Sequence, residues 1–245
     1  MEDRIQRQMW AVLYEPHVRE CLSVLLKPGD VYIEVGAHIG FHAVFAAHRI
    51  GKEGLIFTFE ADPVNFQRLR RNLLQFPWAQ CMNAAVWDRT SSLIFERSST
   101  KGESGWGSVS AVRDFRAGEH VEIPSVALDD WFRDSQVKRW DAMKLDAEGS
   151  ELAVLQGAQS SLEKFQPILV MEINSVLHDQ SGVSPSGVTE FLLEREYRIF
   201  QLEFRRLEPW NRGKITEFCD VLCVPCERAD EVLKQLAIKG FALAR

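Results

Sequence analysis

The chain has 245 residues, of which 46% are hydrophobic and 26% charged, the balance of an ordinary globular protein. This composition excludes a disordered chain, and the length is sufficient to bury a large core. The formal net charge of −6 lacks the basic excess of a nucleic-acid binder, so we expect no nucleic-acid partner. The densest basic run, Arg68, Arg70 and Arg71, has the spacing of a solvated helix face.

The first predicted elements alternate between helix and strand. Apolar residues at helical spacing predict one kinked helix or two short ones over residues 9–26, because Pro16 interrupts the pattern. Short β-branched runs and helix-opening residues such as Pro63 then define the next four elements. They are a strand over 31–35, a helix over 41–50, a strand over 55–59 and a helix over 63–76.

The alternation continues to the end of the chain, except that residues 87–128 form a β-rich excursion. The remaining predicted strands cover 81–86, 140–145, 168–173, 198–204 and 218–224, with helices over 150–162 and 189–196. Strands that alternate with helices predict a mostly parallel sheet covered by helices on both faces. No linker divides the chain, so we expect one domain over residues 1–245, with a helical extension over 1–28.

The apolar runs and the cysteines indicate the cellular compartment in which we expect the protein. No run of 18 apolar residues occurs, so we expect no membrane span, and the N-terminus lacks the apolar core of a signal peptide. The odd count of five cysteines then favours reduced thiols and a cytoplasmic protein. Three of them, Cys219, Cys223 and Cys226, match an iron–sulfur spacing, but we expect them in or beside a buried strand and not in a ligand loop. No pattern indicates an oligomeric state.

The strongest motif is a glycine loop between the first predicted strand and the next helix. It runs from Glu34 to Gly40 with the pattern E-x-G-x-x-x-G. Ligands of open α/β sheets bind beyond the carboxyl ends of the strands, where glycine lets a ligand approach the backbone. His38 stands where the dinucleotide fingerprint has its second glycine, which makes room for a pyrophosphate. The loop therefore favours a nucleoside without phosphates over NAD.

A carboxylate follows at the matching place on the second strand. Glu60 lies 20 residues after Gly40, at the tip of the strand. A carboxylate there can accept hydrogen bonds from both hydroxyls of a ribose. The alternative is a tight turn with an exposed and idle Glu60.

These motifs resemble a known site. Glu34–Gly40 and Phe59–Pro63 are similar to the S-adenosylmethionine site of class I methyltransferases, and Lys144–Glu151, K-L-D-A-E-G-S-E, resembles the FkbM-type methyltransferases. The resemblance covers residues 30–205 and implies a Rossmann-like α/β fold with a mostly parallel seven-stranded sheet. It implies O-methylation of sugars or natural products. The implied cofactor contacts are Glu34, Gly36, Ala37, His38, Ile39, Gly40, Glu60, Ala61, Asn83, Ala84, Ala85 and Asp146.

Carboxylates at strand tips suit the chemistry of this reaction. Methyl transfer to a hydroxyl needs the acceptor oxygen in line with the methyl group and its proton removed. Asp146 and Glu148 are candidates to orient the hydroxyl or act as base, and Glu172 should face the same cleft. His42 is a further candidate base, or alternatively a core residue. Glu151 suits the first turn of a helix as a capping group.

The carboxylates Asp146, Glu148 and Glu172 also suit Mg²⁺, although their spacing does not demand a metal. His38 and His42 have a zinc-like spacing, but His38 precedes the helix, so we expect no zinc there. We predict an S-adenosylmethionine-dependent O-methyltransferase acting on a hydroxyl of a sugar-bearing or natural-product small molecule. A non-catalytic nucleoside-binding protein of the same fold and an NAD-dependent oxidoreductase remain as alternatives.

Overall fold

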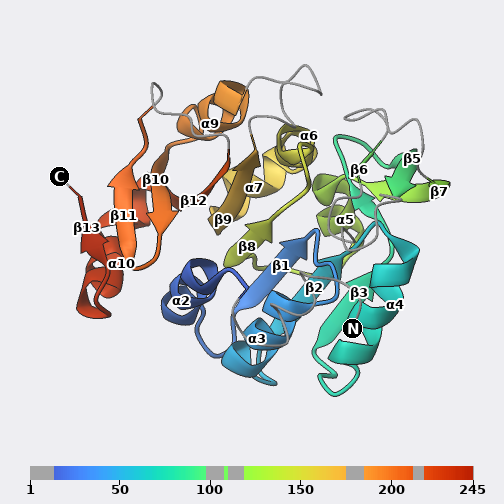
Figure 1. Cartoon of the computed structure of the whole chain (residues 1–245), viewed down its shortest axis with the longest axis horizontal. Coiled ribbons are helices and arrows are strands. Elements are labelled where there is room, and N and C mark those ends of the chain that lie inside the picture. Colours follow the sequence, from blue (N-terminus) through green and yellow to red (C-terminus); the bar gives the residue numbers. More distant parts are fainter. Residues whose placement is uncertain (1–13, 98–107, 110–118, 175–184, 212–217, 245) are drawn as a thin grey trace.

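A large sheet runs through the molecule, with helices packed against it (Figure 1). The structure is a computed structural model and describes residues 14–97, 108–109, 119–174, 185–211 and 218–244. The helices are α2 (Pro16–Leu25), α3 (Phe41–Ile50), α4 (Pro63–Leu73), α5 (Leu128–Asp134), α6 (Glu151–Gln156), α7 (Gln159–Phe165), α9 (Pro185–Leu193) and α10 (Cys226–Ile238). The strands are β1 (Val31–Val35), β2 (Leu55–Phe59), β3 (Ala79–Met82), β4 (Ala85–Val86), β5 (Ser91–Arg97), β6 (Ser108–Val109), β7 (Glu119–Val126), β8 (Ala142–Leu145), β9 (Ile168–Asn174), β10 (Tyr197–Glu203), β11 (Arg206–Pro209), β12 (Phe218–Pro225) and β13 (Ala242–Leu243).

The large sheet has the strand order β13-β11-β10-β12-β9-β8-β1-β2-β3. Strands β3, β2, β1, β8 and β9 pair in parallel, and β12 lies antiparallel between β9 and β10. The prediction of a mostly parallel α/β sheet is confirmed, but the described residues form nine strands of this sheet where we expected seven. The two additional strands, β11 and β13, are four and two residues long, which is too short for a periodic pattern to reveal them.

The helices cover both faces of this sheet, as expected (Figure 1). Successive residues of a strand point to opposite faces, so Tyr32 and Ile33 of β1 enter different hydrophobic clusters. Tyr32 packs in the cluster that contains buried residues of α2, α3, α4 and α10. Ile33 packs in the cluster that contains buried residues of α5, α6, α7 and α9. All five residues of β1 are buried, which is typical of a central parallel strand.

The β-rich excursion forms a second sheet with the order β4-β7-β5-β6, located between β3 and β8 in the chain. Its strands β5 and β7 pair antiparallel, and Phe95 and Ile123 pack with Ala85 in a small core. The predicted third strand over 81–86 was wrong in its extent. The strand β3 ends at Met82, and Ala85–Val86 belongs to the second sheet, where it pairs with β7.

Several helix boundaries also differ from those predicted. The predicted helix over 150–162 is divided into α6 and α7 at Gly157, where a Cβ atom would lie 2.0 Å from the Trp87 carbonyl oxygen. The helix expected over 189–196 begins earlier, at Pro185, and α10 was not predicted. Of the predicted N-terminal helix, residues 9–13 lie outside the described residues, and α2 starts at Pro16, a residue that suits a first turn.

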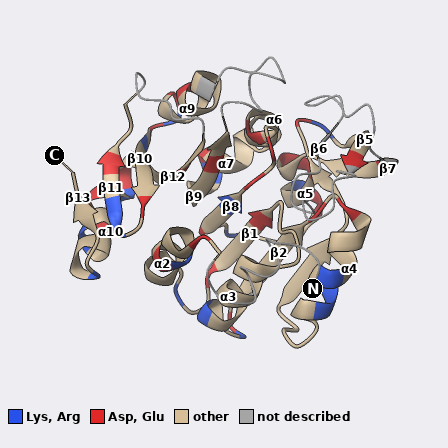
Figure 2. Cartoon of the chain, viewed as in Figure 1, with Lys and Arg blue, Asp and Glu red and all other residues tan. Residues whose placement is uncertain are grey.

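The charged surface agrees with the composition. Figure 2 shows the basic residues of α4, and Arg68, Arg70 and Arg71 are all exposed there, as a solvated helix face requires. Within the described part of the chain, none of the helices combines the length and apolar character needed to cross a membrane.

Gly36 is required where β1 passes the end of β8. Its φ of +76° lies in the left-handed region, and a Cβ atom built on it would lie 1.8 Å from the backbone oxygen of Asp146. We expected this glycine to make room for a ligand. The close approach of two backbone segments already excludes any side chain at this position.

We predict that Gly36→Ala lowers the free energy of unfolding by at least about 2 kcal/mol more than Gly240→Ala does, measured by urea denaturation. Gly240 is the matched control, because its φ is +90° but a Cβ atom added to it would meet only the tip of Arg205 at 3.9 Å. Gly240→Ala should therefore cost only the backbone strain, about 1 to 2 kcal/mol. Equal losses of unfolding free energy in the two variants would contradict a collision between the added Cβ atom and the Asp146 backbone.

Candidate active site

The glycine loop is fixed against the end of β2. The backbone N–H groups of Gly36 and Ala37 both donate to the Phe59 carbonyl, at 3.0 and 3.1 Å. His38 and Gly40 adopt positive φ values of +50° and +89°, and Gly40 then leads directly into α3. The loop residues 36–40 thus lie at the carboxyl end of the parallel strands, where an open α/β sheet binds its ligand.

Glu60 joins this loop to the segment after β2. Its Oε2 accepts the N–H of His38 at 2.7 Å, and its Oε1 accepts the N–H of Asp62 at 2.9 Å. Only 7% of Glu60 is exposed, and this burial raises its pKa to about 8 in spite of the two amide donors. Glu60 is therefore not an exposed, idle residue. A carboxylate has about four acceptor positions, so two remain for the predicted ribose hydroxyls.

Asn83, one of the cofactor contacts implied by the resemblance, links β2 to β3. Its Nδ2 donates to the carbonyl oxygens of Glu60 and Ala61 at 2.8 and 3.1 Å, which fixes the end of β2 beside β3. Ala84 is half-buried, and Ala85 is buried in β4. On the other side of the loop, the Ile39 carbonyl accepts the side-chain amide of Asn72. These contacts place the predicted residues together, and their contact with a cofactor stays a prediction.

A buried lysine lies at the centre of the site. Lys144 on β8 is 4% exposed, and its Nζ lies 2.8 Å from Asp146 Oδ2 and 3.5 Å from Glu15 Oε2. Burial opposes its charge, but Asp146 and Glu15 hold the pKa of Lys144 well above its usual value. Burial in turn raises the pKa of Asp146 to about 6, against the influence of Lys144. The ammonium thus fixes two carboxylates in place.

Glu34 lies beside Lys144 in the sheet, because β1 and β8 pair these two residues. It is buried, and its Oε2 accepts the Tyr32 hydroxyl at 3.1 Å. Burial raises the pKa of Glu34 to about 8. Glu34 therefore belongs to the polar core beneath the loop.

Sequence reasoning missed Glu15. This residue precedes α2 with a φ of +39°, and its Oε2 accepts a hydrogen bond from His42 Nε2 at 2.9 Å. Burial opposes its ionisation, but Lys144 and His42 hold the pKa of Glu15 well below its usual value. The only signal in the sequence is the acidic residue before Pro16, a pattern with no functional meaning by itself.

His42 is a neighbour of Glu15, with its ring enclosed by protein. It is 3% exposed, and burial lowers its pKa. Its Nδ1 is buried and has no hydrogen-bond partner among the described residues. This geometry suits a residue that orients Glu15 better than one that meets a substrate.

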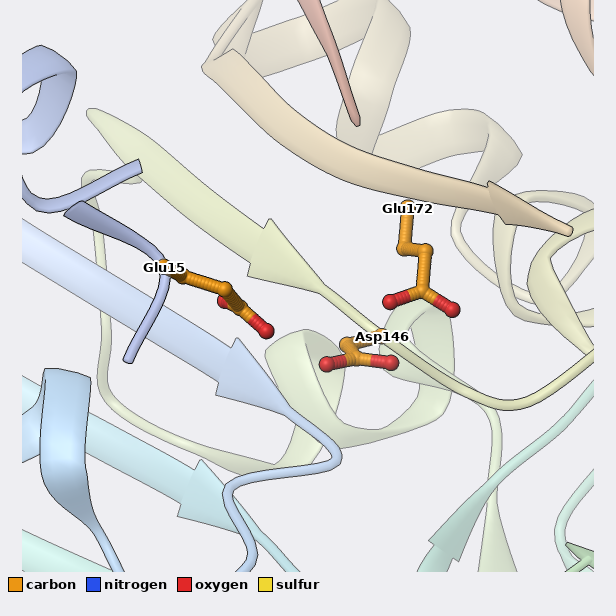
Figure 3. A group of neighbouring side chains, drawn as sticks. All are labelled: Glu15, Asp146 and Glu172. Atoms are coloured by element: carbon orange, nitrogen blue, oxygen red, sulfur yellow. The ribbon is translucent and has the colours of Figure 1, made fainter. Parts of the chain in front are cut away.

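Glu172 completes a group of three carboxylates (Figure 3). Glu15, Asp146 and Glu172 come from the start of α2, the end of β8 and β9, and they point toward one another. One carboxylate oxygen of each lies within 4.8 Å of the others. Glu172 is 8% exposed, and burial together with Asp146 raises its pKa well above the usual range. Asp220 on β12 lies opposite Glu172 and pairs with His17 at 2.6 Å.

The turn after Asp146 positions Glu148 and Glu151 differently. Glu151 lies in the first turn of α6, and its Oε1 accepts the N–H groups of Ala147 and Gly149 at 2.9 and 3.2 Å. Both amides precede the helix, so these bonds close the turn before α6, and a role of Glu151 in capping the helix stays a prediction. Glu148 is half-buried in the turn with a φ of +49°. It lies outside the group of three carboxylates, in which Glu15 takes the place that we expected for Glu148.

Comparison with known proteins identifies this arrangement. The sequence matches the methyltransferase FkbM domain over residues 34–199, which includes the glycine loop, Glu60 and the carboxylates of β8 and β9. The chain belongs to the FkbM methyltransferase family. It is accordingly an S-adenosylmethionine-dependent methyltransferase with the class I methyltransferase fold.

Two relatives of this FkbM protein are informative. Hexuronic acid methyltransferase AglP from Haloferax volcanii is 28% identical over 211 residues, which cover 84% of this chain and 81% of the relative. The crystal structure of an FkbM methyltransferase from Methylobacillus flagellatus superposes with a TM-score of 0.52 and 16% identity. It covers 81% of this chain, which spans 43% of that longer chain. The second comparison supports the fold alone.

We predict that the affinity for S-adenosylhomocysteine, a stable analogue of the cofactor, rises with pH between 6.5 and 8.5. The pKa of Glu60 in the free protein is about 8, so Glu60 is protonated at the lower pH. Ribose hydroxyls would donate to its ionised form. Binding at pH 6.5 therefore includes the cost of removing this proton, and the dissociation constant should be roughly 25-fold larger than at pH 8.5.

Calorimetry on the wild type and on Glu60→Gln measures this effect. The variant should bind more weakly and lose the part of the pH dependence that Glu60 causes, because Gln does not titrate. The same pH slope in both proteins would show that Glu60 does not meet the cofactor.

Proposed function

We propose that this methyltransferase transfers the methyl group to a hydroxyl of a sugar-bearing or natural-product small molecule. The observation that carries the proposal is the group of carboxylates at the carboxyl ends of β8 and β9, beside the glycine loop. Asp146 and Glu172 lie there with Lys144, and Glu148 follows in the adjoining turn. Carboxylates accept hydrogen bonds from hydroxyls and can remove a proton from one of them.

The charge of this group favours a hydroxyl over a carboxyl acceptor. A hydroxyl must lose its proton as the new bond forms, and a carboxylate side chain can take it. A substrate carboxylate has no proton to lose at neutral pH, so it would leave the proton-accepting side chains of this site without a role. The name of the relative, a hexuronic acid methyltransferase, supports a sugar acceptor but not the position of the methyl group, because a hexuronic acid has both hydroxyl and carboxyl groups.

The proposed reaction is a direct displacement. A lone pair of the acceptor oxygen forms a bond to the methyl carbon while the bond from carbon to the sulfonium sulfur breaks and leaves a neutral thioether. The hydroxyl proton passes to Glu148. Asp146, held by Lys144, orients the acceptor, since alignment of the reacting atoms supplies much of the rate enhancement in such transfers. His42 acts through Glu15 as a positioning residue.

The alternatives are less well supported. Membership of the FkbM family argues against an NAD-dependent oxidoreductase, as does His38 in place of the second fingerprint glycine. The exposed arginines of α4 are not accompanied by a net basic charge, so we propose a small-molecule partner and not a nucleic acid. None of the five cysteines forms a disulfide in the described structure, which supports a cytoplasmic location.

A labelled-cofactor assay tests the acceptor. The protein is incubated with methyl-labelled S-adenosylmethionine and paired sugars, for example a methyl glucoside and the matching glucuronoside, and the products are identified by mass spectrometry. We expect label in an ether that survives mild alkali. A product that alkali hydrolyses would be a methyl ester and would contradict hydroxyl transfer. Cofactor binding without turnover on any acceptor would favour a non-catalytic nucleoside-binding protein.

We predict that Glu148→Gln keeps the cofactor affinity and lowers kcat by a factor on the order of 10² to 10⁴, the usual contribution of a general base. Gln preserves the shape of the side chain, so the loss would report charge or proton transfer. Glu163→Gln is the control, since Glu163 is exposed on α7, and it should leave kcat unchanged. Full activity of Glu148→Gln would move the role of base to Asp146 or Glu172.

A further inference from the structure

The group formed by Glu15, Asp146 and Glu172 offers only oxygen atoms. Three separate elements bring them together, and the three carboxylate oxygens lie within 4.8 Å of one another (Figure 3). Oxygens at this spacing can all reach one cation, since Mg²⁺ and Ca²⁺ bind oxygen ligands at about 2.0 to 2.6 Å. His42 Nε2 faces this group but is hydrogen-bonded to Glu15, so it is not available as a ligand. The ligands that remain are all oxygen atoms, which suit a hard divalent cation.

Glu172 supplies a second, independent observation. Its side chain points at Asp146, only 8% of the residue is exposed, and none of the described residues donates a hydrogen bond to its carboxyl group. A buried polar group without a partner costs free energy, and most such groups in proteins have one. A ligand on the side that faces Glu15 and Asp146 would supply the partner that no described residue gives to Glu172.

Lys144 does not supply this partner. Its ammonium contacts Oδ2 of Asp146 and Oε2 of Glu15, and no ion pair joins it to Glu172 among the described residues. A bound divalent cation would favour the ionised form of all three carboxyl groups, and together with the ammonium of Lys144 it would balance their three negative charges.

We propose that Glu15, Asp146 and Glu172 together bind one divalent cation of the Mg²⁺ or Mn²⁺ class. The site differs from the set expected from the sequence, in which Glu148 stood in the place of Glu15. Because Asp146 also borders the acceptor, a cation here would polarise the acceptor hydroxyl. This catalytic role rests on the proposed function, but binding of the cation does not.

Binding is tested with Mn²⁺ alone as the probe. The full chain, freed of metal by chelation, is titrated with MnCl₂, and free Mn²⁺ is followed by electron paramagnetic resonance, with no cofactor or acceptor present. We expect one Mn²⁺ per chain, displaced by excess Mg²⁺. Absence of binding up to roughly 1 mM Mn²⁺, the weak end of biological divalent-cation sites, would overturn the proposal.

Two isosteric variants locate the site. Glu172→Gln should fold, because its carboxyl group makes no hydrogen bond in the described part of the chain. It should weaken Mn²⁺ binding at least about tenfold, the smallest loss expected when even an outer partner of a metal is changed. Glu148→Gln distinguishes this site from the set expected from the sequence and should weaken Mn²⁺ binding less than Glu172→Gln does. Glu163→Gln is the control, because Glu163 is exposed on α7, and it should leave the dissociation constant unchanged. Two results would overturn the assignment. One is an equal Mn²⁺ dissociation constant for the wild type and a folded Glu172→Gln. The other is a larger loss of Mn²⁺ affinity in Glu148→Gln than in Glu172→Gln.

The failure of this proposal can be distinguished from that of the proposed function. Mn²⁺ binding that depends on Glu172, without methyl transfer to any sugar hydroxyl, supports the cation site and contradicts the acceptor. Transfer to a sugar hydroxyl by a protein that binds no Mn²⁺, with a rate that EDTA leaves unchanged, supports the acceptor and contradicts the cation site.

Discussion

Lys144 carries a positive charge into the middle of the sheet, between β1 and β9, and much of the site is arranged around it. A buried charge is expensive unless it is paired, so a lysine at this position requires carboxylates within reach. Asp146 follows on the same strand, but Glu15 comes from the segment before α2. The need to pair one ammonium therefore ties the start of the described chain to the tip of β8.

The same pairing explains why neighbouring carboxyl groups behave differently. Glu15 contacts both Lys144 and His42, which favours its ionised form. Among the described residues, Glu172 has no cation in contact and Glu34 has only the Tyr32 hydroxyl as a hydrogen-bond donor. Burial therefore dominates and favours the protonated forms of both. Acidic residues within one small region thus differ in charge because of the partners that the fold gives them.

Local patterns predicted the part of the fold that depends on local physics. The strands 31–35 and 55–59 and the helix 41–50 have the bounds expected from apolar runs and glycine turns. The prediction failed where contacts between residues far apart in the sequence decide the structure. Ala85–Val86 is apolar and follows β3 closely, yet it pairs with β7, about forty residues later in the chain.

The candidate site also has one part that local sequence patterns predict and another that depends on tertiary contacts. Asp146, Glu60 and the glycine loop stand at strand tips, which sequence order reveals, whereas Glu15 lies about 130 residues from Lys144 and its role depends on tertiary packing alone. The need for glycine at position 36 was predicted, but the reason given, the approach of a ligand, was incomplete. A sequence can indicate that a residue without a side chain is needed, but not that the backbone of Asp146 fills the space.

The two amide hydrogen bonds accepted by Glu60 have a consequence for the thermodynamics of cofactor exchange. They hold the backbone of His38 and Asp62 in place in the free protein, so the conformational entropy of ordering this region is lost during folding and not during binding. A nucleoside that binds at Glu60, as we predict, would meet a surface already in its final shape. Spent and fresh cofactor would then exchange without the backbone around His38 and Asp62 having to open and reclose in each catalytic cycle.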